Sequence, residues 1–232
     1  MTTTSQTAFI ALAARHGVIA DLADDALPTR VRAWRGQDLA LPDEGTHFVY
    51  CAAGSAALEC ELGGFPLAEG MYAALPAHGR IVCGGAGRGL VITRLEFRGA
   101  FLVGGPVEER GRLRYIDGCT DSLLIPPVVL GDPCLNLLHI PPGTHQTQHV
   151  HPSIRVGTIL SGTGTCETPG GKIALEPGLD FVIRAGGRHS FHTAGEALRV
   201  LAWHPDSDCG PSHEDHPMLN RTWIDASGAR VR

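Results

Sequence analysis

Hydrophobic residues occur along the chain in short blocks that are separated by polar and glycine-rich turns. YAALPA (72–77), LVITRLEF (90–97), DFVIRA (180–185) and LRVLAW (198–203) are rich in aliphatic and β-branched residues and have the length of strands. The chain of 232 residues also contains 30 glycines and 16 prolines, which favours many turns. The pattern predicts an all-β protein.

One apolar run near the N-terminus differs from these blocks. Residues 8–14 read AFIALAA, and either Ser5 or Thr7 is a suitable N-cap before them. We therefore predict a short N-terminal helix. The alternative is a secretion signal, but no basic residue precedes the run. No other long apolar stretch predicts an association with a membrane.

The chain also contains an internal repeat. Glycines at fixed spacing indicate that the same backbone turns recur, several of them with positive φ. We predict two tandem β units, residues 1–110 and 111–232, that divide within the charged segment 104–118. A single sandwich with fortuitous glycine spacing is the alternative. The glycines that recur 108 positions later are Gly54, Gly63, Gly70, Gly79 and Gly87, which correspond to Gly162, Gly171, Gly178, Gly187 and Gly195.

Charge and cysteine content exclude some classes of protein. The formal net charge is −5, and the 19 Lys and Arg residues are scattered, so the chain lacks the basic surface of a nucleic-acid-binding protein. The seven cysteines are odd in number and form no CxxC pair, which argues against a disulfide framework or a zinc knuckle. We expect a cytoplasmic protein.

Nitrogen donors concentrate in residues 139–164. His149, His151 and Arg155 lie there, and His189 follows in a later block. Two histidines separated by one residue on a strand project from the same face, and a third from a neighbouring strand can complete a facial set of imidazole ligands. Such a set suits Fe(II), Mn(II), Ni(II), Cu(II) or Zn(II).

The spacing of these residues resembles the two conserved motifs of the cupin superfamily. The resemblance implies a bicupin, with two tandem cupin-type β-barrels (double-stranded β-helix or jelly roll). It also implies that His149, His151 and His189 bind one divalent transition metal. The matching stretches are Gly143-x5-His149-x-His151-x3-Arg155-x6-Gly162 and Gly178-x5-Arg184-x-Gly186-x2-His189-x3-Thr193.

Three positions depart from the cupin pattern. Arg155 stands where cupins often have a glutamate ligand, Arg184 replaces a proline, and Thr193 replaces an asparagine. Arginine remains protonated and cannot bind a metal. The resemblance therefore implies a three-histidine centre with open coordination positions. It is closer to the three-histidine dioxygenases and hydrolases of the superfamily than to its four-ligand, oxalate-handling members.

Arg155 is a candidate catalytic residue. One uninterrupted strand would place it on the same side as His149 and His151, because all three positions are odd. A guanidinium beside a divalent cation is unfavourable unless an anion lies between them, so we expect a substrate carboxylate or enolate to bridge the two. The alternative is that Arg155 pairs with an acid such as Glu167 or Asp180.

The other histidines are candidates for different roles. His204 ends the last strand of the repeat and is a candidate catalytic acid or base at the mouth of the cavity. We expect His145 to lie at the surface, with a hydrogen bond to a metal ligand as the alternative, and His192 to face away from the barrel. The segment 213–217 (HEDHP) is expected to form a solvated loop or lid.

The first repeat lacks the histidine set. Leu41, Asp43 and Ile81 occupy the positions that correspond to the three histidines, and His47 corresponds to Arg155. A single histidine cannot hold a catalytic metal. We therefore expect the first barrel to serve as a packing partner.

These features predict an enzyme with a mononuclear metal centre and a small anionic organic substrate. The resemblance favours a three-histidine Fe(II) dioxygenase, with Zn, Ni or Mn as alternative metals. A non-redox metal-dependent isomerase, lyase or hydrolase is the first alternative, and a non-enzymatic small-ligand-binding cupin is the second. From the family we also expect a homodimer.

Overall fold

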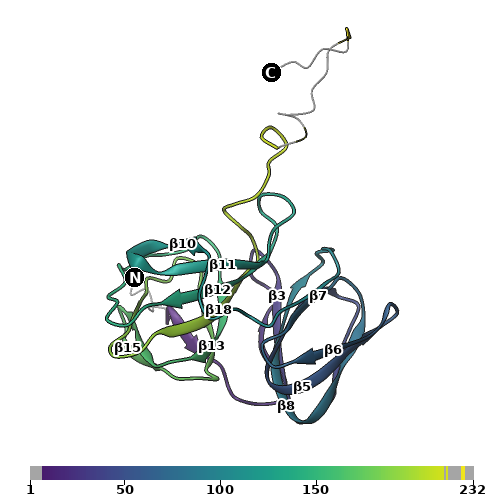
Figure 1. The fold of residues 1–232 in the computed structure, drawn as a ribbon, viewed down its shortest axis with the longest axis horizontal. Helices are drawn as coiled ribbons and strands as arrows, with labels where there is room; N and C mark the ends of the chain where they lie inside the picture. Colours follow the sequence, from purple (N-terminus) through teal and green to yellow (C-terminus); the bar gives the residue numbers. More distant parts are fainter. Residues whose placement is uncertain (1–6, 217, 219–225, 228–232) are drawn as a thin grey trace.

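The computed structural model describes residues 7–216, 218, 226 and 227. Residues 7–216 form antiparallel strands and one 3-10 turn, arranged as two β-barrels that lie side by side (Figure 1). This confirms the predicted all-β fold. Within the described part of the chain, no helix has the length and apolar character needed to cross a membrane.

The first barrel is built on one sheet with the strand order β2-β3-β8-β5-β7-β9, to which β4 and β6 add through β8 and β5. Its strands are β2 (Gly17–Leu22), β3 (Thr29–Arg35), β4 (Leu39–Leu41), β5 (Gly45–Cys60), β6 (Gly63–Ala68), β7 (Tyr72–Leu75), β8 (Gly79–Leu95) and β9 (Leu102–Gly104).

The second barrel combines a sheet of order β1-β16-β13-β18-β12-β11-β10 with a smaller sheet of order β15-β14-β17. Its strands are β1 (Phe9–Ala11), β10 (Leu113–Arg114), β11 (Thr120–Ile125), β12 (Cys134–Ile140), β13 (Arg155–Ser161), β14 (Gly164–Thr168), β15 (Gly171–Leu175), β16 (Asp180–Ile183), β17 (Ser190–His192) and β18 (Leu198–His204). The 3-10 turn η1 (Ile116–Gly118) joins β10 to β11.

The two longest strands, β5 and β8, each contribute to both walls of the first barrel. Their pairing shifts register between Cys51 and Ser55, and such bulges bend a strand. Gly54 lies in the bend with φ +70°, and a Cβ there would lie 3.1 Å from the Cα of Gly87. Glycine at position 54 therefore permits both the backbone conformation and the close approach.

The internal repeat corresponds to recurring turns. Three pairs of repeated glycines have positive φ in both copies, as expected for turns that favour glycine. The pairs are Gly54 and Gly162 (70° and 78°), Gly63 and Gly171 (125° and 124°), and Gly70 and Gly178 (81° and 87°).

The hydrophobic core has three parts. One fills the interior of the first barrel and includes the fully buried Ile81, and a second lies inside the second barrel around Phe181. The third lies between the barrels, where the rings of Phe48 and Trp203 are 5.6 Å apart. The barrels are thus joined by a continuous apolar interface.

The prediction of an N-terminal helix is wrong for the described residues 7–14. Phe9–Ala11 instead form β1, which pairs with β16 of the second barrel, and Phe9 stacks on Phe181 at 4.9 Å. Burial of Phe9 and pairing with a strand edge stabilise an extended segment, whereas an isolated helix of this length would be marginal. Ser5 lies outside the described residues.

The position of β1 also affects the domain assignment. Residues 9–11 belong by sequence to the predicted first unit, 1–110, but their strand is part of the sheet of the second barrel. The two large sheets are separated in the chain by the stretch between Gly104 and Leu113. Division at residues 110 and 111 stays a prediction.

Candidate metal centre

His149, His151 and His189 converge in the second barrel. One donor atom from each lies within 4.8 Å of the others. His149 and His189 face each other across an isolated antiparallel bridge, in which each backbone N–H donates to the other carbonyl at 3.0 Å. His151 follows His149 in an irregular segment that connects β12 to β13. The backbone thus holds two of the imidazoles opposite each other, and the third lies beside them.

Backbone carbonyls fix the orientation of two of the rings. The Nδ1 of His149 donates to the carbonyl of Thr147 at 2.8 Å, and the Nδ1 of His189 donates to the carbonyl of Gly187 at 2.9 Å. A proton on Nδ1 leaves Nε2 as the lone-pair donor, which is the usual arrangement of a histidine that binds a metal.

The protonation state of the cluster also suits a cation. Burial, with a smaller contribution from Arg155, lowers the pKa of His151 to about 3. Burial likewise lowers the pKa of His189 to about 4, despite its hydrogen bond to Gly187. Both rings are therefore neutral at neutral pH, and neutral imidazole is the form that binds a metal. The donor set fits a divalent transition metal.

The histidines line a cavity of about 380 Å³ in the second barrel. This volume falls in the range of small-molecule sites. Most of its wall is apolar, and several polar side chains also line it. The apolar lining residues are Leu113, Leu138, Phe181, Ile183, Phe191, Val200 and Ala202, and the polar ones include Asp121, Asn136, Gln146, Arg155, His204 and Asp208.

Arg155 is the first residue of β13 and is buried in the cavity wall. The chain leaves regular strand geometry between His151 and Arg155, so strand parity does not explain its position. Its hydrogen bonds are all donated by Nη1, to the carbonyls of Ser153 (3.3 Å) and Ile154 (3.0 Å) and to the Ser153 hydroxyl (2.6 Å). Among the described residues, Nε and Nη2 have no acceptor.

Neither of the acids considered as alternative partners pairs with Arg155. Glu167 forms an ion pair with Lys172 at 2.6 Å, and Asp180 pairs with Arg35 at 3.1 Å. The only carboxylate of the described chain within ion-pair distance of Arg155 is that of Asp206, at 4.0 Å. The guanidinium thus retains two nitrogens for a ligand in the cavity.

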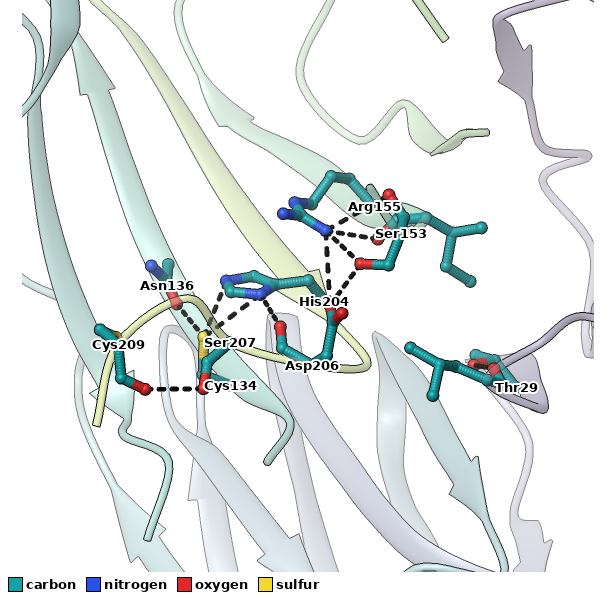
Figure 2. A network of polar contacts seen from close by, with 11 residues as sticks. Thr29, Cys134, Asn136, Ser153, Arg155, His204, Asp206, Ser207 and Cys209 are labelled. Carbon is teal, nitrogen blue, oxygen red and sulfur yellow. Dashed lines mark hydrogen bonds and ion pairs between the residues drawn. The ribbon is translucent and has the colours of Figure 1, made fainter. Parts of the chain in front are cut away.

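His204 ends β18 beside Arg155, and both of its ring nitrogens have partners (Figure 2). Nδ1 donates to the carbonyl of Asp206, and Nε2 lies 2.7 Å from the Sγ of Cys134. Burial, followed by the charge of Arg155, lowers the pKa of His204 to about 4. Burial raises the pKa of the Cys134 thiol. The pair is therefore a neutral thiol beside a neutral imidazole.

Several polar residues of the cavity were not identified as candidates from the sequence, among them Asp121 and Asn136. Asp121 lies on β11 and Asn136 on β12, and the Nδ2 of Asn136 donates to Oδ1 of Asp121 at 3.0 Å. Asn136 interrupts an apolar strand, CLNLLHI, whereas Asp121 lies between Thr120 and Ser122 near the start of its strand. A buried polar group needs a hydrogen-bond partner or a functional role. The polar side chain of Asn136 within an apolar strand was therefore a sequence feature that could have identified it as a candidate.

The remaining histidines of this region lie outside the cavity lining. His145 is exposed, and its Nδ1 is 3.3 Å from the Nδ1 of His192. Arg184 is also absent from the lining, and its backbone N–H donates to the carbonyl of Ala8 at 3.0 Å. His213–His216 do not line the cavity either, and Pro217, the last residue of that segment, lies outside the described residues.

The first barrel has no comparable cluster among the described residues. Leu41 and Ile81 are buried in its apolar core. His47 is buried too, with Nδ1 2.8 Å from the Thr93 hydroxyl and Nε2 2.8 Å from the carbonyl of Pro42. This histidine is part of the packing of the first barrel.

Comparison with known proteins supports this description. Residues 136–204, which contain the three histidines, match the family model described as "Cupin domain". No curated protein matches the chain. Similar solved structures cover both barrels at low sequence identity, so they indicate a shared fold alone.

Three of these structures illustrate the similarity. A cupin 2 conserved barrel domain protein from Leptotrichia buccalis has a TM-score of 0.59 and 15% identity, covering 88% of this chain and 92% of that one. A putative glyoxylate induced protein from Pseudomonas aeruginosa has a TM-score of 0.64 and 11% identity, covering 91% and 94%. A point mutant of Bacillus subtilis oxalate decarboxylase has a TM-score of 0.56 and 13% identity, covering 90% and 79%.

The cupin match covers the barrel that holds the histidine cluster, and the solved structures share the fold of both barrels. Residues 136–204 are thus similar to the Cupin domain family, and the chain has two tandem barrels of which, among the described residues, only the second has the three-histidine cluster.

Proposed function

We propose that the protein is a metal-dependent enzyme that acts on a small anionic organic substrate, with one divalent transition metal held by His149, His151 and His189. The proposal is carried by the convergence of the three imidazoles on the wall of a cavity of about 380 Å³. A metal at this position would polarise substrate oxygen atoms or support redox chemistry.

Arg155 binds the anionic group of the substrate in this proposal. Its Nε and Nη2 have no acceptor among the described residues, and a guanidinium can form two parallel hydrogen bonds to a carboxylate. An anion between Arg155 and the metal also offsets the repulsion between the two positive charges. The apolar lining of the cavity strengthens these interactions because it excludes water.

Within this class we favour a three-histidine Fe(II) dioxygenase. Three protein ligands leave coordination positions for a substrate and a second small molecule, and we propose O2 as that co-substrate. The side chains of the cavity orient the substrate and shield it from water. The imidazole set accepts Zn, Ni or Mn as well, so the metal that the cell supplies decides between redox and other chemistry.

A non-redox lyase, isomerase or hydrolase is the second candidate. Similar solved structures include Bacillus subtilis oxalate decarboxylase, a protein with Mn(II) centres. A Mn(II) centre in this chain would polarise a substrate carboxylate or carbonyl without a need for O2.

Reconstitution with different metals tests these proposals. The protein purified without a tag is stripped and loaded in parallel with Fe(II), Mn(II) and Zn(II), and small carboxylates and diketones are screened for O2 consumption and for product. Turnover that needs both Fe(II) and O2 supports the dioxygenase. Turnover with Zn(II) or Mn(II) under nitrogen supports the non-redox candidate. Tight binding without turnover under all conditions would contradict an enzymatic role.

We also propose that the protein is a homodimer and acts in the cytoplasm. Sedimentation at several concentrations tests the first of these, and fractionation of cells tests the second. A concentration-independent monomer would contradict the dimer.

A further inference from the structure

A row of four polar side chains crosses one wall of the cavity. Arg155, His204, Asn136 and Asp121 come from the adjacent strands β13, β18, β12 and β11, in that order, and all four line the cavity. Neighbouring strands are about 4.8 Å apart, so three strand spacings, roughly 14 Å, separate the two ends of the row across the sheet. The registers Cys134↔His204 and Asp121↔Leu138 displace Asp121 along the strands as well. The row therefore provides polar contacts at two separate places in the cavity.

Hydrogen bonds connect the middle of this row. The thiol of Cys134 lies 2.7 Å from Nε2 of His204 and 3.1 Å from Oδ1 of Asn136 (Figure 2). The Nδ2 of Asn136 donates onward to Asp121. Because Nδ1 of His204 donates to the carbonyl of Asp206, its Nε2 is an acceptor that faces the thiol, whose single proton is donated either to it or to Oδ1 of Asn136. His204 has no unpartnered nitrogen for a substrate, so its role is to position its neighbours.

Asp121 differs from the rest of the row in having an unpartnered carboxylate oxygen. Its Oδ1 accepts the hydrogen bond from Asn136 at 3.0 Å. Its Oδ2 accepts no hydrogen bond from a described residue, and no basic side chain of the described chain forms an ion pair with it. A half-buried carboxylate oxygen in a largely apolar cavity is stabilised when a ligand donates to it.

We propose that Asp121 binds a hydrogen-bond-donating group of the substrate, at the end opposite the carboxylate that Arg155 holds. The substrate class is then a small organic acid whose far end bears an ammonium, amide or hydroxyl group. This inference rests on the proposed function of the cavity as an anion-binding metal site. The carboxylate acceptor and the guanidinium fork at opposite ends of the row would fix the direction in which such a molecule lies.

The protonation of Asp121 is compatible with this role. Burial raises the pKa of Asp121 to about 6, against the lowering effect of the hydrogen bond from Asn136. The group is therefore a carboxylate at pH 8, where binding is best measured.

Matched ligand pairs test the inference. Isothermal titration of the Zn(II)-loaded protein at pH 8 compares pentanoate with 5-aminopentanoate, and butanoate with 4-aminobutanoate. The two members of each pair differ only by the terminal ammonium. In these molecules the nitrogen lies too far from the carboxylate to form, with the metal, the short chelate ring that an α-amino acid forms. At least one amino acid should bind about tenfold or more tightly than its plain acid, in the range expected for a charged hydrogen bond. In Asp121→Asn this preference should disappear, while the affinity for the plain acid is kept.

Asp208 provides the matched control. It is an exposed carboxylate that also lines the cavity, so Asp208→Asn removes a charge of the same sign without changing Asp121. The preference should persist in this variant. Equal binding of both members of each pair to the wild type, or a preference that survives in Asp121→Asn, would overturn the role of Asp121. Failure of the plain acids to bind the wild type would instead contradict the anion site on which the inference rests.

Discussion

His149 and His189 lie opposite each other across an antiparallel bridge, with their ring centroids 4.5 Å apart. Two backbone hydrogen bonds of 3.0 Å hold the bridge, and a carbonyl two residues earlier fixes each ring through Nδ1. The ligands are thus oriented by the backbone. Little rearrangement is needed for a metal to bind, which favours affinity.

Metal binding should stabilise the protein. A ligand that binds only the folded state at 100 times its dissociation constant adds about 2.7 kcal/mol to the free energy of unfolding. We therefore expect Zn(II) to raise the Tm of the stripped protein and excess chelator to reverse the change. In His189→Ala the increase should be absent. An equal increase in that variant would show that Zn(II) binds elsewhere.

Arg155→Ala should keep the metal but weaken the binding of anions. Loss of a charged hydrogen bond costs about 1.5–3 kcal/mol, so the dissociation constant of pentanoate from the Zn(II)-loaded protein should rise by a factor of about 10 to 150. Titration calorimetry measures this change. Arg155→Lys, which retains the charge but loses the planar fork, should give an intermediate value. Unchanged affinity in the alanine variant would exclude Arg155 from the anion site.

The buried His47 should make stability depend on pH. Burial lowers its pKa from 6.5 to about 4 in the folded state. Between these values the unfolded chain binds the proton and the folded chain does not, so the free energy of unfolding falls as the pH is lowered from about 6.5 to 4.

The wild type should lose up to about 3 kcal/mol from this group over that range. His151, His189 and His204 have lowered pKa values and change stability in the same direction, so the measurement is the difference between the wild type and His47→Gln. Urea unfolding of both proteins at about pH 7 and about pH 4.5 should show a smaller decrease for the variant. Parallel curves would contradict the role of His47.

Strand β1 should stabilise the second barrel. Phe9 is only 3% exposed and stacks on Phe181. Phe9→Ala should reduce the free energy of unfolding by about 3 kcal/mol, as other buried Phe→Ala changes do. Leu62→Ala is the control, because Leu62 is 66% exposed and its replacement should cost no more than about 0.5 kcal/mol. Equal and small effects in both variants would mean that β1 contributes little.

Much of the fold follows from local sequence patterns, whereas parts that depend on distant pairing do not. The apolar blocks and the repeated glycines are local signals, and they correspond to strands and positive-φ turns in the structure. The segment at Phe9 is extended because β16, far along the chain, offers it a partner. That information is absent from the local pattern of residues 8–14.

The candidate site shows the same distinction. The spacing of His149, His151 and His189 indicated a common cluster, and the structure brings them together. Arg155 does line the cavity, but through an irregular connection that strand parity could not anticipate. Asp121 comes from a different strand, and its relation to the site depends on the order of strands in the sheet.

The most direct test of the account is the metal content of the untagged protein, measured by plasma mass spectrometry in the wild type, His149→Ala and His145→Ala. His145 is an exposed histidine outside the cavity, so it is a matched control. We predict close to one equivalent of a divalent transition metal in the wild type and in His145→Ala, and almost none in His149→Ala. A wild type that holds no metal even after reconstitution, or a His149→Ala protein that retains it, would contradict the three-histidine centre.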